Sequence, residues 1–117
     1  MLEVTKREAA QIASGRQKVI RRAFHKHDYK PGVKIPLMLK GEKSSEPVLV
    51  VECLGVAEHT LGVMDDGRAK DEVYDSLAAW KIHWENLYRG TNRVNADTRV
   101  TALRVRKTDL ERARVKE

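Results

Sequence analysis

The sequence predicts an α+β protein: a small, mostly antiparallel β-barrel with two flanking helices. Three observations lead to this fold class. The 117 residues are enough for one domain but too few for two. Four segments have the length and apolar content of strands, and two others have helical periodicity. The predicted order is helix, three strands, helix and strand. We expect one domain over 1–117, with its core at about 4–107 and a charged tail at 108–117.

The first helix is predicted for residues 6–14. Thr5 fits its N-cap, and Glu8 stands where its side chain can return a hydrogen bond to that cap, which is the capping-box pattern. Gly15 suits the position just after the end of a helix. A short basic strand is then predicted for residues 17–22.

Two further strands are predicted before the second helix, at residues 33–39 and 47–58. Pro36 has no backbone N–H, so we expect the first of them to lie at a sheet edge or to carry a bulge there. The second is the most apolar segment of the chain, PVLVVECLGVAE, and should be a central strand. Its Gly55 indicates a bend.

A second helix is predicted for residues 70–88, after a loop at 61–69. Its apolar residues recur at steps of four and three, which makes one stripe that should pack on the barrel. The stripe consists of Val73, Leu77, Trp80, Trp84 and Leu87. The last strand is predicted at 98–107, and the residues from 108 to 111 could start a helical turn that frays.

Charge is distributed unevenly along the chain, whose net charge is +6. Residues 1–34 carry a net charge of +6, residues 35–75 carry −5, and residues 76–117 carry +5. The two basic ends would form one basic face if they met in space. The chain has no run of 18 apolar residues and no apolar signal segment, so we expect no membrane partner and a cytoplasmic location. Its one cysteine excludes an internal disulfide.

The basic cluster around the first strand is the main candidate binding site. Concentrated Lys and Arg beside a rigid strand suit a phosphate backbone. A two-sided strand should not bury charge on both faces, so at least half of these side chains should reach solvent or a cleft. The alternative is an ordinary solvated surface. The candidate nucleic-acid-binding residues are Arg16, Lys18, Arg21, Arg22, Lys26 and Lys30.

Other candidate sites carry less weight. His25 and His27 lack the neighbouring cysteine or carboxylate cluster that a metal ion needs, so we expect no metal and no cofactor. Cys53 lies in an apolar strand and should be buried. His83 is expected to be a packed or surface histidine, and the tryptophans of the helical stripe are expected to pack in the core rather than to stack bases.

The order of elements, together with short motifs, resembles the ASCH domain of the PUA-like barrel superfamily. That family begins with a helix ending in Gly and a strand motif close to G-R-K-T-x-T-x-R, followed by a Y/F-K-x-G-D turn. A long apolar strand, a helix rich in Trp and Leu and a final strand come next. The sequence as a whole is more similar to the bacterial and bacteriophage-encoded members than to the eukaryotic coactivator type. The matching residues are Gly15-Arg16, Arg22, Tyr29–Gly32, Val50–Val56, His83-Trp84-Glu85 and the strand from Thr98.

The resemblance implies two kinds of function. Many members of the family are thought to bind RNA in the cleft between barrel and helices. Some small bacterial members are amidohydrolases that remove the acetyl group from N-acetylated cytidine, using a Lys and a Thr of the strand motif and a Glu before the second helix. Here Gln17 and Ile20 stand at the Lys and Thr positions, and neither can act as an acid, base or nucleophile. Asp66 is the nearest match to the Glu.

We therefore expect a non-catalytic ASCH module whose partner is RNA or a nucleotide. One alternative is a hydrolase that acts on a modified nucleoside or on RNA, with a rearranged site using Lys18 and Asp66. Another alternative is a phage-type interaction module that binds a host protein through its charged faces. These functional expectations rest on analogy of fold, which constrains function weakly.

Overall fold

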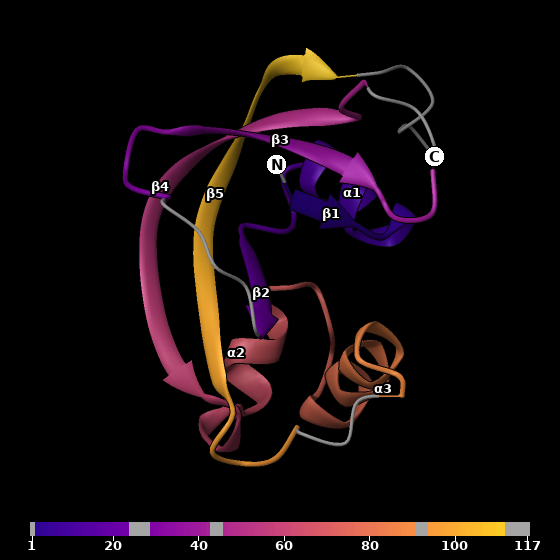
Figure 1. Cartoon of the computed structure of the whole chain (residues 1–117), viewed down its shortest axis with the longest axis vertical. Helices are drawn as coiled ribbons and strands as arrows, with labels where there is room; N and C mark the ends of the chain where they lie inside the picture. The colour runs from indigo at the N-terminus through magenta and orange to yellow at the C-terminus, as the bar shows by residue number, and fades with distance from the viewer. Residues whose placement is uncertain (1, 24–28, 43–45, 91–93, 112–117) are drawn as a thin grey trace.

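Five strands form one curled sheet in the computed structural model, which describes residues 2–23, 29–42, 46–90 and 94–111, without the side chains of 109–111. The sheet order is β1-β3-β4-β5-β2 (Figure 1). β1 pairs with β3 in parallel, and the other neighbours are antiparallel. The predicted α+β class and small, mostly antiparallel barrel-like fold are confirmed, although the sheet closes only as a half-barrel and the described chain has three helices where two were predicted. The strands are β1 (Leu2–Val4), β2 (Val19–Ala23), β3 (Lys34–Leu39), β4 (Leu49–Thr60) and β5 (Arg99–Glu111).

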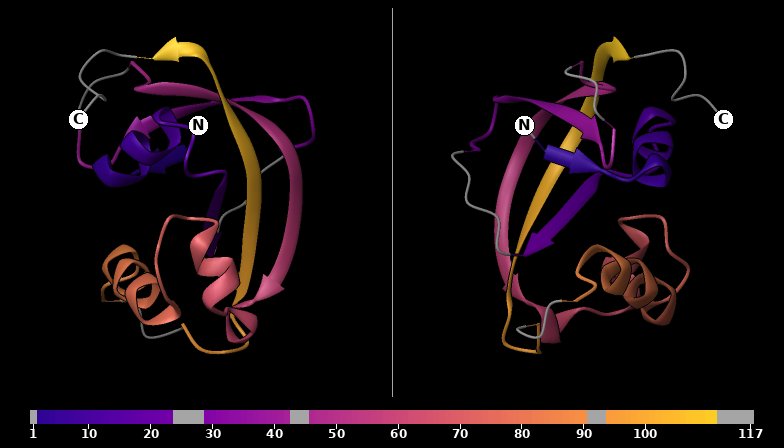
Figure 2. Two further views of the ribbon diagram at one scale, coloured as in Figure 1. Left: turned by 180° about the vertical axis from the view of Figure 1, so that it is seen from behind. Right: turned by 45° about the vertical axis from the view of Figure 1, so that its right-hand side comes forward.

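The helices lie against the sheet at two different levels. Helix α1 (Lys6–Ala13) lies beside the end of the sheet that contains β1 and β3, and α2 (Asp66–Lys70) and α3 (Leu77–Leu87) lie at the other end (Figure 2). The capping box of α1 is confirmed, because the backbone N–H of Glu8 donates to Thr5 Oγ1 at 3.1 Å and the N–H of Thr5 donates to Glu8 Oε1 at 2.9 Å. A single 3-10 turn, Leu61–Val63, follows β4.

The strand predictions are confirmed in outline and corrected at their ends. β2 begins only at Val19, two residues later than predicted. β5 continues to Glu111, so the helical turn predicted from residue 108 is wrong; Glu111 instead pairs with Leu49 of β4. Antiparallel pairing supplies backbone partners that a frayed helical turn would lack, which favours the longer strand.

The sheet has an irregularity at the bend predicted for Gly55, and a second register shift between Leu49 and Val51 that was not predicted. The register of β4 against β5 shifts between Cys53 and Gly55, at the predicted bend. β3 is an interior strand, so the predicted sheet edge at Pro36 is wrong for the strand as a whole. Pairing with β1 starts only at Leu37, however, so at Pro36 the strand pairs with β4 alone.

The single helix predicted for residues 70–88 is wrong, because the chain leaves helical geometry between α2 and α3. Val73 has a φ of 64°, a left-handed conformation that a β-branched residue rarely adopts. Ser76 then starts α3 as its N-cap, with its side chain accepting from the N–H of Ala79. Of the predicted stripe, Trp80 and Trp84 are buried, whereas Val73 and Leu77 are only partly so.

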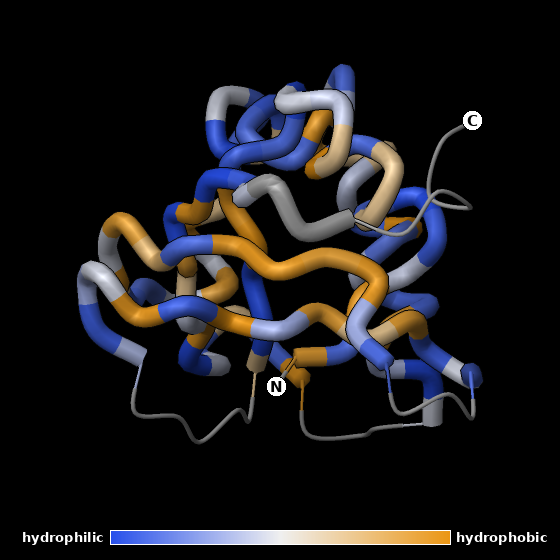
Figure 3. The backbone as a smooth tube through the Cα atoms, turned by 90° about the horizontal axis from the view of Figure 1, so that it is seen from above, coloured by the Kyte–Doolittle hydropathy of each residue, from blue (hydrophilic) through white to orange (hydrophobic). Residues whose placement is uncertain are grey.

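Two apolar cores lie on the sheet, and Figure 3 shows apolar stretches of the strands running through the middle of the molecule. The larger core joins α1 to the sheet and includes Cys53, which is buried as predicted. The smaller core joins α2 and α3 to the far end of the sheet. In the described part of the chain no helix has the length and apolar character needed to cross a membrane. The smaller core consists of Ala23, Met64, Ala69, Trp80, Trp84 and Val100.

Candidate functional site

The predicted basic residues divide into an exposed group and a buried group. Arg16, Lys18 and Lys30 are exposed, whereas Arg21 and Arg22 are buried. Lys26 lies outside the described residues, as do His25 and His27. β2 therefore buries charge on both faces, and the expectation that a strand cannot do so is wrong. The reason is that each arginine has its own buried carboxylate partner.

Arg22 forms a two-pronged ion pair with Glu8 of α1. Its Nη2 lies 2.8 Å from Glu8 Oε1 and its Nη1 lies 3.0 Å from Glu8 Oε2. Nη2 also donates to the carbonyl of Glu3 in β1 at 2.9 Å. Because β1 and β2 are the two edges of the sheet, this one side chain links its opposite ends. Burial alone would raise the pKa of Glu8, but the charge and hydrogen bonds of Arg22 outweigh burial and lower it.

Arg21 points to the other face of β2 and contacts the segment between α2 and α3. Its guanidinium donates to Glu72 Oε2 at 3.2 Å, to the carbonyl of Arg68 at 3.0 Å and to His59 Nε2 at 3.1 Å. The half-exposed Asp71 lies 3.5 Å away. All three guanidinium nitrogens are therefore occupied by the protein itself.

Glu72 is the most deeply buried carboxyl group of this region, with no exposed surface. Its Oε2 accepts from Arg21 and from the indole N–H of Trp80 at 2.6 Å, but its Oε1 has no partner. Burial raises the pKa of Glu72 to about 7, because the charge of Arg21 and the Trp80 hydrogen bond only partly offset desolvation. A carboxyl group with these properties is a candidate acid or base, which sequence reasoning missed.

His83 of α3 completes this cluster. Its Nε2 lies 3.7 Å from Glu8 Oε2, beyond hydrogen-bond range, and has no partner. Its ring stacks on Tyr74, with centroids 5.2 Å apart. Burial lowers the pKa of His83, although Glu8 acts in the opposite direction. We refer to Glu8, Arg21, Arg22, Glu72 and His83 as the ionic centre.

The turn that carries Glu72 is held by Arg7 of α1. The Arg7 guanidinium donates to the carbonyl of Val73 at 2.6 Å and to that of Glu72 at 3.4 Å. It also lies 3.9 Å from the centre of the Tyr74 ring, in a cation–π contact. These contacts stabilise the left-handed conformation of Val73, which an isolated chain would avoid.

The ionic centre offers the ligand types of a metal site, but its charges do not require a metal ion. One ligand atom from each of Glu8, Glu72 and His83 lies within 4.8 Å of the other two. Both carboxylates already face a guanidinium group, so a divalent cation would leave a surplus of positive charge in a buried region. The two guanidinium groups therefore already supply the positive charge that a metal ion would bring to these carboxyl groups.

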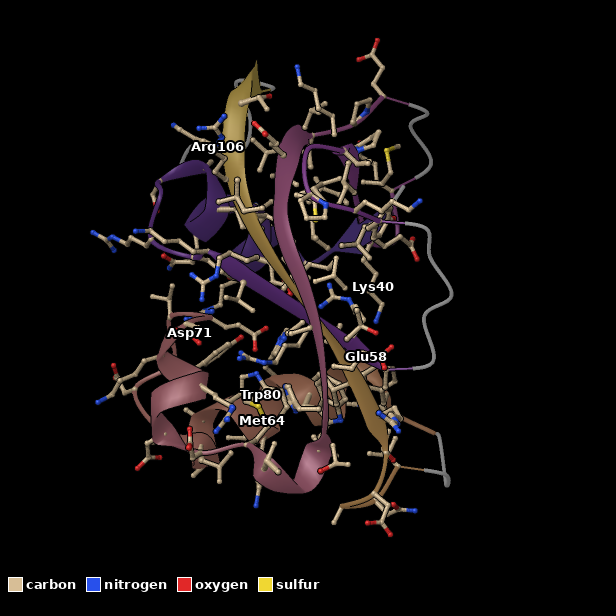
Figure 4. All side chains as sticks on the ribbon, turned by 90° about the vertical axis from the view of Figure 1, so that its left-hand side faces the viewer. Lys40, Glu58, Met64, Asp71, Trp80 and Arg106 are labelled. Carbon is tan, nitrogen blue, oxygen red and sulfur yellow. The ribbon has the colours of Figure 1, made fainter. Side chains whose placement is uncertain are left out.

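A second feature, which we call the basic groove, lies between the end of α1 and the outer face of β5. Its volume is about 320 Å³. Lys18 directly precedes β2, and its carbonyl accepts from the N–H of Val105 in β5 at 2.9 Å. Lys18 from one basic end of the chain and Arg104 from the other therefore line the same groove. Figure 4 shows Arg106 toward this end of β5, with Trp80 and Met64 toward the opposite end of the molecule. The groove is lined by Ile12, Gly15, Gln17, Lys18, Leu54, Arg104, Val105, Arg106 and Lys107.

Among the described residues at or beside the groove, three cations have neither an ion pair nor a side-chain hydrogen bond: Lys18 and Arg104 in the groove lining, and Arg16, which stands between the lining residues Gly15 and Gln17. All three are exposed, and no described carboxylate pairs with them. Arg106 is paired with Glu52 at 2.6 Å, and Lys107 Nζ donates to the carbonyl of Ala13 near the end of α1. Sequence reasoning missed that the basic residues of β5 line the same groove as Lys18.

The positions of the expected catalytic residues are filled by groups without that chemistry. Gln17 is buried and donates its side-chain amide to the carbonyl of Val19, and Ile20 lies in the larger core. Asp66 accepts a hydrogen bond from the N–H of Leu77 at 2.7 Å and so supports the start of α3. The rearranged pair of Lys18 and Asp66 therefore gains no support from groove geometry, since Asp66 does not line the groove.

Comparison with solved structures identifies the fold. The ASCH domain from Lactobacillus crispatus JV V101 matches with a TM-score of 0.66 at 14% identity, over 85% of this chain and 69% of that one. The chain has the ASCH fold. The ASCH protein from Zymomonas mobilis matches with a TM-score of 0.62 at 11% identity, over 90% of this chain and 64% of that one.

Other comparisons agree with this fold or add nothing to it. The protein EF3133 from Enterococcus faecalis V583 matches with a TM-score of 0.66 at 14% identity, over 89% of this chain and 68% of that one. No family model and no curated protein matches the sequence. The ASCH fold predicted from sequence motifs is confirmed, and identities this low carry no information on the activity of the chain.

Proposed function

We propose that this ASCH-fold chain is a non-catalytic nucleic-acid-binding module, and that single-stranded RNA binds along the basic groove. The observation that carries the proposal is that Lys18 and Arg104, from the two basic ends of the chain, line one groove, with Arg16 between the lining residues Gly15 and Gln17. Cations that are exposed and free of carboxylates are the groups that neutralise phosphates and release counterions.

The proposal changes the residues assigned to binding. Arg21 and Arg22 are engaged by Glu72 and Glu8, and moving either one to a phosphate would leave a buried carboxylate without its partner. The exposed members of the original cluster remain in the proposed interface together with Arg104. The exposed side chain of Leu54 in the groove wall adds an apolar surface on which a base can pack.

A non-catalytic role agrees with the polar groups of the groove. Gln17 has no acid or base function, and the cations around it have no exposed carboxylate, thiol or imidazole within the groove lining. The groove can therefore bind an anion, but its described lining holds no group to activate a water molecule.

The test is the salt dependence of RNA affinity, measured by fluorescence anisotropy on a labelled single-stranded oligoribonucleotide. Three phosphate contacts predict a slope of about −2 for log K against log salt, at about −0.7 per contact. The double variant Lys18→Ala/Arg104→Ala should reduce this slope to about −0.7 and weaken binding.

The matched control is Lys70→Ala/Arg89→Ala, which removes the same charge from exposed positions on α2 and after α3. It should leave the slope unchanged. Equal effects of the two double variants would indicate general charge attraction and contradict a site in the groove. Absence of RNA binding at low salt would overturn the proposed function and favour a protein partner.

A further inference from the structure

A cavity larger than the basic groove lies between α3 and the far end of the sheet. Its volume is about 550 Å³, within the size range of pockets that hold small organic molecules. Most of its lining residues are apolar. Figure 4 shows two of them, Trp80 and Met64, at the opposite end of the molecule from Arg106 of the basic groove. We refer to it as the aromatic cavity.

The walls of the aromatic cavity are fixed by backbone structure. One wall is α3, and the other is formed by the segments that follow β4 and precede β5. The N–H of Gly62 donates to the carbonyl of Ala96 at 2.8 Å, and the N–H of Leu61 donates to the carbonyl of Thr98 at 2.8 Å. A Cβ at Gly62 would crowd the Ala96 oxygen at 3.1 Å, so glycine suits this close approach. The cavity is therefore defined by the fold and does not have to be opened by its ligand.

Three aromatic rings of α3, those of Trp80, Trp84 and Tyr88, follow one another at steps of one helical turn along the cavity. The rings of Trp80 and Trp84 stack with centroids 4.9 Å apart, and the Tyr88 ring lies 4.6 Å from that of Trp84. Residues four positions before and after a helical residue lie on its two sides along the axis, so both faces of the Trp84 ring are covered. The surface that Trp84 can offer the cavity is therefore its edge, which carries the N–H and the positive part of the ring quadrupole.

The indole N–H of Trp84 is the polar group of this aromatic row that lacks a partner. Trp80 donates to Glu72 Oε2 at 2.6 Å, and the Tyr88 hydroxyl group bonds to the backbone of Ala23. Trp84 Nε1 is buried, and no described group accepts a hydrogen bond from it. An indole nitrogen only donates, so the missing partner is an acceptor. An occupant of the cavity beside this ring is placed to supply it.

The charged side chains of the cavity lining balance each other. Lys81 and Glu85 are both exposed, and they are one helical turn apart on α3. A ligand with a net charge would have to leave water for an apolar lining that offers no excess of the opposite charge. The aromatic cavity therefore favours an uncharged ligand, in contrast to the basic groove.

We propose that the aromatic cavity binds an uncharged, flat heteroaromatic molecule whose ring nitrogen or ring carbonyl accepts from the indole N–H of Trp84. Such an acceptor lies in the plane of its ring, so the edge of the ligand can meet the edge of Trp84. The faces of the ligand then contact Met64 and the aliphatic side chains of the lining. The site is separate from the basic groove, and the inference does not depend on RNA binding.

The test compares isoquinoline, which is flat and has one ring nitrogen, with naphthalene, which has the same shape and no acceptor. Each probe is titrated into the isotope-labelled wild-type protein at pH 8, where isoquinoline is uncharged, and the indole N–H resonances are followed by NMR. Isoquinoline should bind saturably and move the Trp84 indole N–H downfield, whereas that of Trp80, already held by Glu72, should move less. Naphthalene should bind about fivefold more weakly, the value of one hydrogen bond, and cause no downfield shift.

A substitution of Trp84 isolates the contribution of its N–H. Trp84→Phe keeps an aromatic ring and removes no hydrogen bond of the described structure. It should abolish the preference for isoquinoline over naphthalene. The control is Ile82→Ala, which shortens an exposed apolar side chain of α3 outside the cavity lining. This variant should keep the wild-type affinity and preference.

Four results would overturn the inference. The wild-type protein could fail to bind isoquinoline saturably, or it could bind both probes equally well, which would show that no acceptor is required. Shifts confined to residues 15–18 and 104–107 would place the probe in the basic groove. A preference for isoquinoline that persists in Trp84→Phe would show that another group donates the hydrogen bond.

Discussion

The pH dependence of unfolding should reveal two opposing proton-binding groups in the ionic centre. In the unfolded chain Glu72 titrates near 4.5 and His83 near 6.5, whereas folding raises the pKa of Glu72 to about 7 and lowers that of His83. The contribution of Glu72 to stability is present below pH 4.5 and is lost as pH rises to about 7. The contribution of His83 is present above pH 6.5 and is lost as pH falls.

The two contributions oppose each other where both groups titrate. Folding raises the proton affinity of Glu72 and lowers that of His83. Each group alone changes the free energy of unfolding by up to about 1.4 kcal/mol per pH unit, with opposite sign. The wild-type protein should therefore show a smaller pH dependence from these two groups than either group would give alone.

Single substitutions should reveal how the free energy of unfolding depends on pH through each group separately. In His83→Gln only Glu72 titrates, so stability should fall by about 3 kcal/mol between pH 4.5 and pH 7. In Glu72→Gln only His83 titrates, so stability should rise with pH up to about 6.5.

Urea unfolding followed by tryptophan fluorescence measures these slopes, because both tryptophans are buried in the smaller core. Subtracting the free energy of unfolding of the wild type from that of each variant at the same pH removes the contribution of all other titratable groups. Parallel pH profiles in the three proteins would refute this account of the ionic centre.

Three other outcomes are expected. Val73→Gly should raise the free energy of unfolding by about 1 kcal/mol, because it removes left-handed strain; Ala78→Gly in exposed α3 should lower it by a similar amount. Arg22→Met should lower it by about 3–5 kcal/mol by leaving Glu8 unpaired, and adding Glu8→Leu should recover part of the loss; no recovery would show that the ion pair is not the cause. Purified protein should not release acetate from acetylcytidine, since Gln17 and Ile20 cannot supply the chemistry; robust turnover would contradict this.

Much of the fold could be predicted because its determinants are local. The capping box at Thr5 and the bend at Gly55 each involve neighbouring residues, and the structure has both. The prediction of one helix at residues 70–88 was wrong because the apolar stripe continues across the break between α2 and α3. Ser76 caps the N-terminus of α3 through its own side chain, and a polar residue that can cap competes with helix continuation. Ser76 could have been recognised as an N-cap from the sequence, but the continuous apolar stripe favoured a single long helix.

The candidate site was less predictable because its partners are distant in the chain. Glu8 is 14 residues from Arg22, and Glu72 is 51 residues from Arg21. Sequence alone placed both arginines in a binding surface, since only tertiary contacts show that a buried carboxyl group engages each one. The exposed part of the site was visible as the outward alternation of β5. The position of Lys18 beside these residues of β5 could not be predicted, because it depends on which strands pair.

The basic groove as the binding surface is tested most directly by NMR mapping on the isotope-labelled protein, with single-stranded RNA added at low salt. We expect the largest backbone shifts at residues 15–18 and 104–107, with small changes along α3. Their magnitude should fall steeply as salt is raised. Shifts concentrated on α2 and α3, with residues 15–18 and 104–107 unchanged, would contradict the account.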